Sequence, residues 1–149
     1  DGALRYVSCV SRSDTIDGWR EHRSGGGIVI DTAANTVVAD GLSMPHSPRW
    51  YGGRLWVHDS GTGYFGYVDL ARGRFEQIAF CPGYLRGLSL FREFAVMGLS
   101  LPRGDRTFSG LPLDENLRAR STEARCAIQV VYGPVQPSVA AVDAATRVD

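Results

Sequence analysis

Lysine is absent from this chain of 149 residues: the 16 basic residues are all arginine, and 16 acidic residues balance them. A net charge of zero leaves no excess of basic side chains to bind nucleic acid or an anionic membrane, so neither is expected as a partner. Arginine binds carboxylates and phosphates through two parallel hydrogen bonds. The codon preference of a GC-rich genome accounts for the bias more simply, so the missing lysine does not by itself indicate a function.

Cysteine is scarce as well. The chain has three cysteines, Cys9, Cys81 and Cys126, and no two of them have the CxxC spacing. An odd number without that spacing argues against a disulfide framework and against a zinc site. We therefore expect three small buried thiols in a reducing compartment, and hence a cytoplasmic protein.

Long apolar runs and common catalytic signatures are also missing. No apolar run reaches about 18 residues, the length at which a membrane-spanning helix becomes a candidate, and no charged and then apolar leader opens the chain. We expect a soluble protein. The sequence contains no GxSxG, no HExxH and no P-loop lysine. Because these absences remove only some enzyme classes, the sequence leaves open whether the protein is an enzyme.

Glycine, by contrast, is plentiful, with 18 residues, and it separates short apolar segments. This pattern is typical of a turn-rich all-β protein. One helix is a candidate, at residues 112–120, where Asp114 and Glu115 would lie in the first turn. The predicted strands cover residues 5–10, 28–31, 37–39, 48–51, 55–58, 64–69, 74–80, 85–90, 94–98 and 126–131.

The predicted strands recur with a period. Asp31 and Asp69 are 38 positions apart, and Leu55 and Phe94 are 39 apart. A period of about 40 with four short strands per unit is typical of β-propeller blades, and this length supplies about three of them. We therefore predict an all-β fold of propeller-like, four-stranded antiparallel blades, an incomplete propeller, with a β-sandwich and an open meander as alternatives.

The propeller repeats are expected over residues 1–131, and residues 132–149 are expected to form an irregular or disordered tail. Two closely spaced prolines in that tail do not suit an inner strand. Three blades do not close a ring, because closed propellers have at least about four. The chain is therefore expected to be a fragment of a larger propeller or to complete its ring as a homo-oligomer.

One group of candidate site residues lies near the predicted propeller axis. His46 and Arg49 open one inner strand, and Arg86 holds the equivalent place in the next unit. His46 could act as a general base or a metal ligand, and the two arginines could bind an anionic group. Alternatively, His46 is held between two prolines and hydrogen-bonds to the backbone of a turn.

Three aspartates are candidates for turn-forming roles. Asp31 and Asp69 occupy one repeat position, which indicates a structural turn. Asp59 is expected to cap the turn that follows it, although His46, Asp59 and backbone carbonyls could instead hold a divalent metal such as Ca or Zn. That second arrangement would fit a hydrolase or lactonase of the propeller kind. Otherwise we expect no cofactor.

Two long polar loops, residues 11–24 and 101–125, fall at the same point of the repeat and should project from one face. Paired insertions on one face are typical of a binding surface. An aromatic side chain flanked by arginines suits a partner protein or a small anionic ligand. Alternatively, the two loops pack on each other. The candidate binding residues in these loops are Trp19, Arg20, Arg103 and Arg106.

Several stretches together resemble an uncharacterised family of bacterial proteins that carry a domain of unknown function, sometimes beside tetratricopeptide repeats. The resemblance covers Arg5 to Val131, and the chain departs from the family pattern after Val131. It implies a propeller-like repeat fold and carries no catalytic residues. The stretches are Gly18–Glu21, Gly25–Gly27, Leu42–Trp50, Asp59–Gly63 and Arg106–Asp114.

Taken together, these patterns favour a non-enzymatic binding module that recognises a partner protein or a small anion through its loop face. The alternatives are a metal-dependent enzyme of the hydrolase or lactonase kind, with its site on the channel axis, and a truncated fragment without function.

Overall fold

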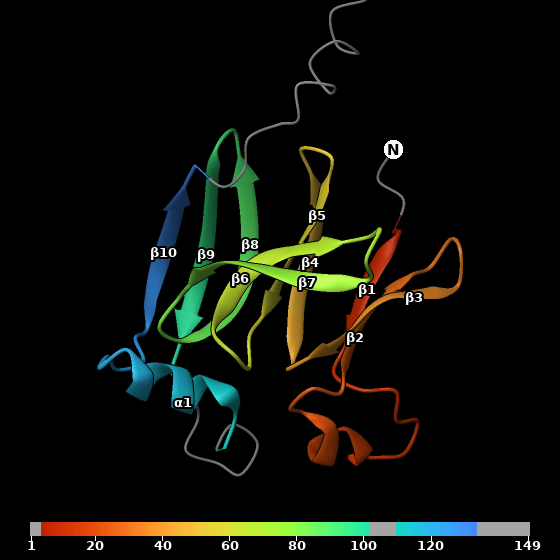
Figure 1. The fold of residues 1–149 in the computed structure, drawn as a ribbon, viewed down its shortest axis with the longest axis horizontal. Coiled ribbons are helices and arrows are strands. Elements are labelled where there is room, and N and C mark those ends of the chain that lie inside the picture. The colour runs from red at the N-terminus through yellow and green to blue at the C-terminus, as the bar shows by residue number, and fades with distance from the viewer. Residues whose placement is uncertain (1–3, 102–109, 134–149) are drawn as a thin grey trace, which may run out of the picture.

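The computed structural model describes residues 4–101 and 110–133. In these residues the chain forms three antiparallel sheets (Figure 1). Within each sheet, strands that are consecutive in the chain are hydrogen-bonded neighbours. The first sheet contains β1 (Tyr6–Cys9), β2 (Gly27–Asp31) and β3 (Thr36–Leu42). The second contains β4 (Pro45–Tyr51), β5 (Arg54–Asp59), β6 (Tyr64–Asp69) and β7 (Arg74–Phe80). The third contains β8 (Tyr84–Phe91), β9 (Phe94–Ser100) and β10 (Ala127–Tyr132).

The predicted antiparallel β architecture is confirmed in its coarse form, as a mostly β fold, but its finer form needs correction. Only the second sheet has the four strands expected of every unit, and none of the three sheets is closed. The strands β6 and β7 have the predicted bounds. The strand β4 begins at Pro45 rather than at residue 48, because a bulge between His46 and Arg49, with Ser47 at a φ of 57°, accommodates the second proline.

The repeat distance between the second and third sheets is 40 residues, not 39. Two-residue turns join β4 to β5 and β8 to β9, so that Tyr51 pairs with Arg54 and Phe91 pairs with Phe94. Phe94 therefore corresponds to Arg54, and its side chain is 36% exposed, whereas Leu55 is fully buried. The predicted correspondence of Leu55 and Phe94 in successive repeat units aligned two apolar residues. The register of the hairpins, however, determines which residues correspond.

Both faces of β5 are buried, and this explains its three consecutive apolar residues, Leu55, Trp56 and Val57. Leu55 and Val57 pack on one side with Val29 and other residues of the first sheet. Trp56 points to the other side and packs with Leu85 and its neighbours in the third sheet. Because successive side chains of a strand face opposite ways, one strand serves two apolar interfaces.

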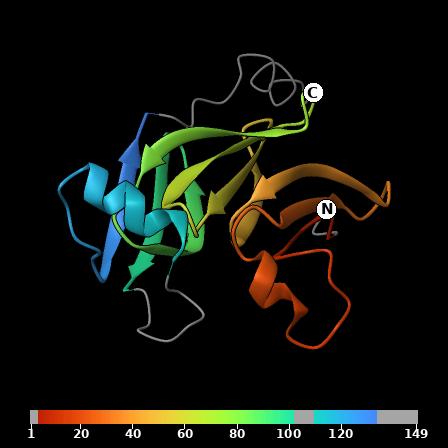
Figure 2. The same cartoon turned by 60° about the horizontal axis from the view of Figure 1, so that its bottom comes forward.

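Two helical segments lie at the same end of the sheets (Figure 1, Figure 2). The helix α1 (Pro112–Ala119) confirms the helix predicted there, with Pro112 at its start and two acidic residues in its first turn. The short 3-10 helix η1 (Gly18–His22) lies in a stretch predicted as a polar loop, because five residues without buried side chains leave no periodic pattern. No helix in the described ranges is long and apolar enough to cross a membrane.

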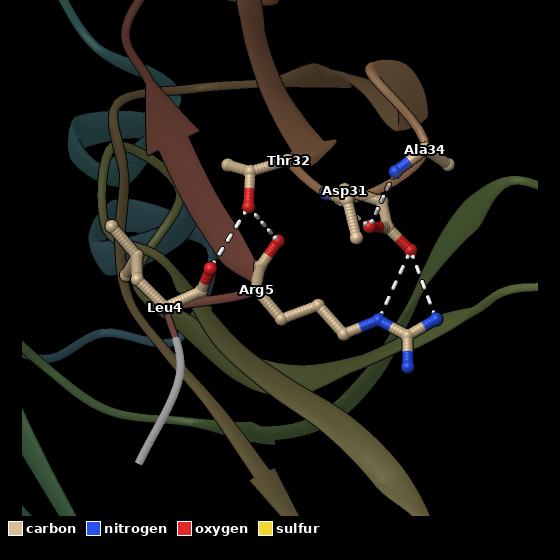
Figure 3. Close-up of polar contacts among 6 residues, drawn as sticks. Leu4, Arg5, Asp31, Thr32 and Ala34 are labelled. Carbon is tan, nitrogen blue, oxygen red and sulfur yellow. Dashed lines mark hydrogen bonds and ion pairs between the residues drawn. The ribbon is translucent and has the colours of Figure 1, made fainter. Parts of the chain in front are cut away.

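The two repeated aspartates form the same turn. Oδ1 of Asp31 accepts the backbone N–H groups two and three positions later at 3.0 and 3.2 Å, and Asp69 does so at 3.0 and 3.1 Å. Arg5 also donates twice to Oδ2 of Asp31, at 3.2 and 3.1 Å (Figure 3). The predicted turn role is confirmed. Tyr132 occupies the corresponding position at the end of β10.

The cysteines differ in their environments. Cys81 is fully buried, Cys9 is partly buried and Cys126 is exposed, and all three are free. The prediction of three buried thiols is therefore right only for Cys81. The apolar residues on one side of β10 are themselves exposed, which explains why Cys126, just before that strand, is not covered.

Candidate functional site

The described parts of the two long loops, residues 11–24 and 110–125, lie at the end of the molecule where β4 and β8 begin (Figure 1). Residues of both loops pack against one cluster of buried side chains, the loop-end cluster. Trp19 from the first loop is half-buried there. The placement of these described parts on one side agrees with the prediction, and their shared packing agrees with the alternative that the two loops pack on each other. The loop-end cluster consists of Met44, Tyr84, Leu111, Leu113 and Leu117, with Val10, Trp19, Phe80 and Ala124 packed against it.

The turn after β5 fixes the start of β4. Oδ1 of Asp59 accepts the backbone N–H of Ser43 at 2.6 Å, and Oδ2 accepts the hydroxyl of Thr62 at 2.9 Å. The backbone N–H of Gly61 donates in turn to the carbonyl of Ser43 at 2.8 Å. Burial raises the pKa of Asp59 to about 6. The turn-capping role predicted for Asp59 is therefore met only in part: its carboxylate contacts its own turn through the Thr62 hydroxyl, whereas the backbone N–H that it accepts belongs to Ser43, in the linker between β3 and β4.

The same turn positions the third sheet and α1. The hydroxyl of Ser60 donates to the carbonyl of Leu85 at 2.9 Å, next to the start of β8. The backbone N–H of Leu113 donates to Gly61 at 2.8 Å, and the side-chain amide of Asn116 donates to the carbonyl of Thr62 at 2.9 Å. One short turn thus holds β4, β8 and α1 in a fixed relation.

His46 and Arg86 meet at this end, as the repeat predicts. They are 40 residues apart, and Nη1 of Arg86 lies 3.1 Å from Nδ1 of His46 and also contacts Nε2. The hydroxyl of Tyr84 lies 3.2 Å from the same Nε2, and the Arg86 guanidinium lies over the Tyr84 ring at 4.6 Å. Burial, and secondarily the charge of Arg86, lower the pKa of His46 to about 4. His46 is therefore neutral at pH 7.

Arg49 does not join this pair. It lies three positions further along β4, beyond the bulge that separates it from His46. Its side chain is exposed, and Nη1 donates to the carbonyl of Pro48 at 2.9 Å. The predicted pair of anion-binding arginines is thus reduced to Arg86.

A pocket of about 370 Å³ opens beside His46 and Arg86, and we call it the His46–Arg86 pocket. It brings Trp19 of the first loop next to these two residues of the inner strands. Arg20 is not part of its wall: it pairs with Asp17 at 3.1 Å and lies over the Trp19 ring at 4.9 Å. The lining residues are Val10, Ser11, Ser13, Trp19, Met44, His46 and Arg86.

The charge of Arg86 is not neutralised within the described part of the chain. Among residues 4–101 and 110–133, the ion pairs are made by Arg5, Arg12, Arg20, Arg72 and Arg74. Arg86 instead contacts a neutral imidazole and an aromatic ring. Its remaining N–H groups can serve an anion, because charge-assisted bonds from guanidinium to carboxylate or phosphate are among the stronger hydrogen bonds in proteins.

The predicted metal set is not assembled. His46 and Asp59 are on paired strands, but His46 pairs with His58, whose side chain faces the opposite way from that of Asp59. The imidazole nitrogens of His46 contact Arg86 and Tyr84, and the Asp59 carboxylate accepts hydrogen bonds from Ser43 and Thr62. No three histidine, cysteine or acidic side chains in the described ranges come together as a metal site requires.

A second histidine, His58, lies opposite His46 on the neighbouring strand β5. His58 is fully buried, and neither ring nitrogen has a hydrogen-bond partner. Its ring stands edge-on to Phe65, with 6.0 Å between the ring centroids. Burial, with smaller contributions from His46 and Arg49, lowers the pKa of His58 to about 3. This side chain is held neutral in an apolar environment, which costs stability unless something offsets it.

Two predicted loop residues, Arg103 and Arg106, lie outside the described residues. Sequence reasoning did not find Tyr84 and Met44. The repeat carries a signal for both, because the period of 40 aligns Tyr84 with Met44 just as it aligns Arg86 with His46. The meeting of Trp19 with these residues has no such signal, since it depends on how the first loop folds back.

Comparison with known proteins places the chain in a family. No curated protein and no solved structure matches it significantly. A family model described as a domain of unknown function (DUF4915) matches residues 1–149. That match extends beyond Val131, where the predicted resemblance ends. The chain belongs to the DUF4915 family.

Proposed function

We propose that this protein is a non-enzymatic binding module that takes a small anionic ligand into the His46–Arg86 pocket. The observation that carries the proposal is the guanidinium of Arg86, which lines a pocket and pairs with no carboxylate among the described residues. An anion placed there would gain a charge-assisted hydrogen bond without displacing an existing ion pair.

The state of His46 supports binding rather than catalysis. A general base works best when its pKa is near the working pH, and the pKa of His46 is lowered to about 4. Its two nitrogens are also engaged by Arg86 and Tyr84. A neutral His46 places no second positive charge beside Arg86, and it can orient the guanidinium toward the pocket.

We further propose that the three sheets are successive units of a propeller-like scaffold. The strand β4 packs against β8, so the first strands of two neighbouring units are in contact. The strand β3 packs against β7, so the last strands of two neighbouring units are in contact as well. This is the order that blades arranged around an axis would have. Such a scaffold places the beginnings of β4 and β8, and hence the pocket, close to that axis.

Isothermal titration calorimetry with acetate, benzoate, sulfate and inorganic phosphate tests the binding proposal. We expect at least one of these anions to bind the unmodified chain, and Arg86→Gln to weaken its binding by about tenfold or more, or about 1.4 kcal/mol. Arg49→Gln is the matched control, because Arg49 is an exposed arginine outside the pocket. The proposal fails if none of the four anions binds, or if both variants bind them equally well.

A further inference from the structure

The walls of the His46–Arg86 pocket are chemically divided. Arg86 and His46 supply polar groups and one positive charge, Ser11 and Ser13 add two hydroxyls, and Val10, Trp19 and Met44 supply apolar surface. Building on the proposed function, we infer that the ligand is an organic carboxylate with a single negative charge on a flat apolar body, as in a simple aromatic acid. The carboxylate would bind Arg86, and the body would lie against Trp19.

The number of charges in the wall favours a monoanion. Among the residues that the structure describes, Arg86 is the one cationic residue that lines the pocket, since His46 is neutral at pH 7. A carboxylate matches this single charge and can accept two parallel hydrogen bonds from one guanidinium. A phosphate dianion would keep a second charge, and the described lining residues offer no further opposite charge to offset its lost hydration.

The size and apolar side of the pocket favour a ligand larger than a bare anion. The volume of about 370 Å³ is in the range of pockets that hold small organic ligands. Acetate would leave the Trp19 and Met44 walls in contact with water, whereas an aromatic ring would cover them. An aromatic pair in stacked or edge-on contact adds about 0.5–1.5 kcal/mol beyond the area that it buries.

The Trp19 wall is held in place before any ligand arrives. Arg20 lies over its ring at 4.9 Å and is itself paired with Asp17 at 3.1 Å. The indole also packs against the loop-end cluster from within its own loop. A wall that is already ordered loses less conformational entropy on binding, so it discriminates better between ligands of different shape.

A matched ligand series tests this inference by calorimetry on the full chain. The series consists of benzoate, acetate, benzyl alcohol and inorganic phosphate at pH 7. We expect benzoate to bind about tenfold or more tightly than each of the other three. Trp19→Leu should bring the affinity for benzoate down toward that for acetate and leave acetate unchanged. Arg86→Gln should weaken both carboxylates.

The outcomes separate this inference from the proposed function. If phosphate binds as tightly as benzoate and Arg86→Gln weakens both, the carboxylate class is wrong and anion binding stands. If acetate equals benzoate, the apolar body is wrong. If benzyl alcohol equals benzoate, or if neither these four ligands nor sulfate binds, both proposals fail. Circular dichroism melting of Trp19→Leu and Arg86→Gln verifies that any lost affinity is measured on folded protein.

Discussion

The carboxylate of Asp59 accepts the backbone N–H of Ser43 at 2.6 Å, and both residues are buried. This bond joins two stretches of the chain that stand out in the sequence, Leu42–Trp50 and Asp59–Gly63. The first opens β4 and the second closes β5. Because both stretches lead into the pocket end of the molecule, their hydrogen bond sets the position of His46.

Replacing Asp59 by alanine should destabilise the fold by about 1–3 kcal/mol, because the buried N–H of Ser43 would lose its acceptor. Asp59→Asn keeps an acceptor oxygen at the same place and should stay close to the unmodified chain. Urea unfolding monitored by tryptophan fluorescence at pH 7 measures both. Equal losses in the two variants would show that the hydrogen bond to Ser43 is not what Asp59 supplies.

The local features of the fold could be predicted from the sequence. Turn residues and alternating side chains lie within one hairpin, so β6, β7 and the aspartate turns at Asp31 and Asp69 were within reach. The start of β4 was missed because its prolines argue against a strand unless a bulge is known. The repeat was shifted by one residue because register depends on the partner strand, which the hydrophobic pattern of one strand does not reveal.

Some contacts of the candidate site could likewise be predicted from the sequence, and others could not. The approach of His46 to Arg86 follows from the repeat, because equivalent positions in neighbouring units lie side by side. The exclusion of Arg49 depends on the bulge, and the arrival of Trp19 depends on a loop with no counterpart in the second sheet. Contacts of this kind are made by residues far apart in the chain, so no local sequence pattern predicts them.

Replacing His58 by leucine should stabilise the protein. Both ring nitrogens of His58 are buried without a partner, and such unsatisfied groups cost about 1–3 kcal/mol. Leucine is apolar and of similar volume, so it removes this cost and keeps the contact with Phe65. We expect a higher urea midpoint at pH 7.

The exposed His22 provides the control for this change. His22→Leu should leave the urea midpoint nearly unchanged, because that imidazole is already hydrated. A loss of stability in His58→Leu, larger than any loss in His22→Leu, would mean that His58 makes a favourable interaction in solution.

The free energy of unfolding should fall as the pH is lowered from 6 to 4. Burial lowers the pKa of His46 to about 4 and that of His58 to about 3. The stability that these neutral histidines contribute is therefore fully present above pH 6.5 and is lost on acidification. Asp59 acts oppositely: its pKa is raised to about 6, so its contribution is present below 3.8 and is lost as the pH rises. Between pH 6 and 4 the unfolded state binds about two more protons at the histidines, and the folded state binds about one more at Asp59. Unfolding therefore takes up roughly one proton, and the free energy of unfolding changes by about 1.4 kcal/mol per pH unit.

Variants of these groups separate the two opposing contributions. His58→Leu should make the stability nearly independent of pH between 6 and 4, because one histidine then balances Asp59. Asp59→Asn should make the dependence about twice as steep, because both histidines remain unopposed. Urea unfolding at pH 6, 5 and 4 gives the three slopes. Identical slopes in all three proteins would show that these groups do not govern the acid response.

The cysteines should react with alkylating reagents in the order of their exposure. Cys81 is fully buried, its Sγ lies 3.7 Å from the sulfur of Met97, and burial raises its pKa to about 11. Cys126 is exposed. Because the thiolate is the reacting form, iodoacetamide at pH 8 should modify Cys126 quickly and Cys81 only when the protein opens. Peptide mass spectrometry over time distinguishes the sites, and in urea all three cysteines should react alike. Modification of Cys81 in the folded protein as fast as that of Cys126 would contradict the packing of the second sheet against the third.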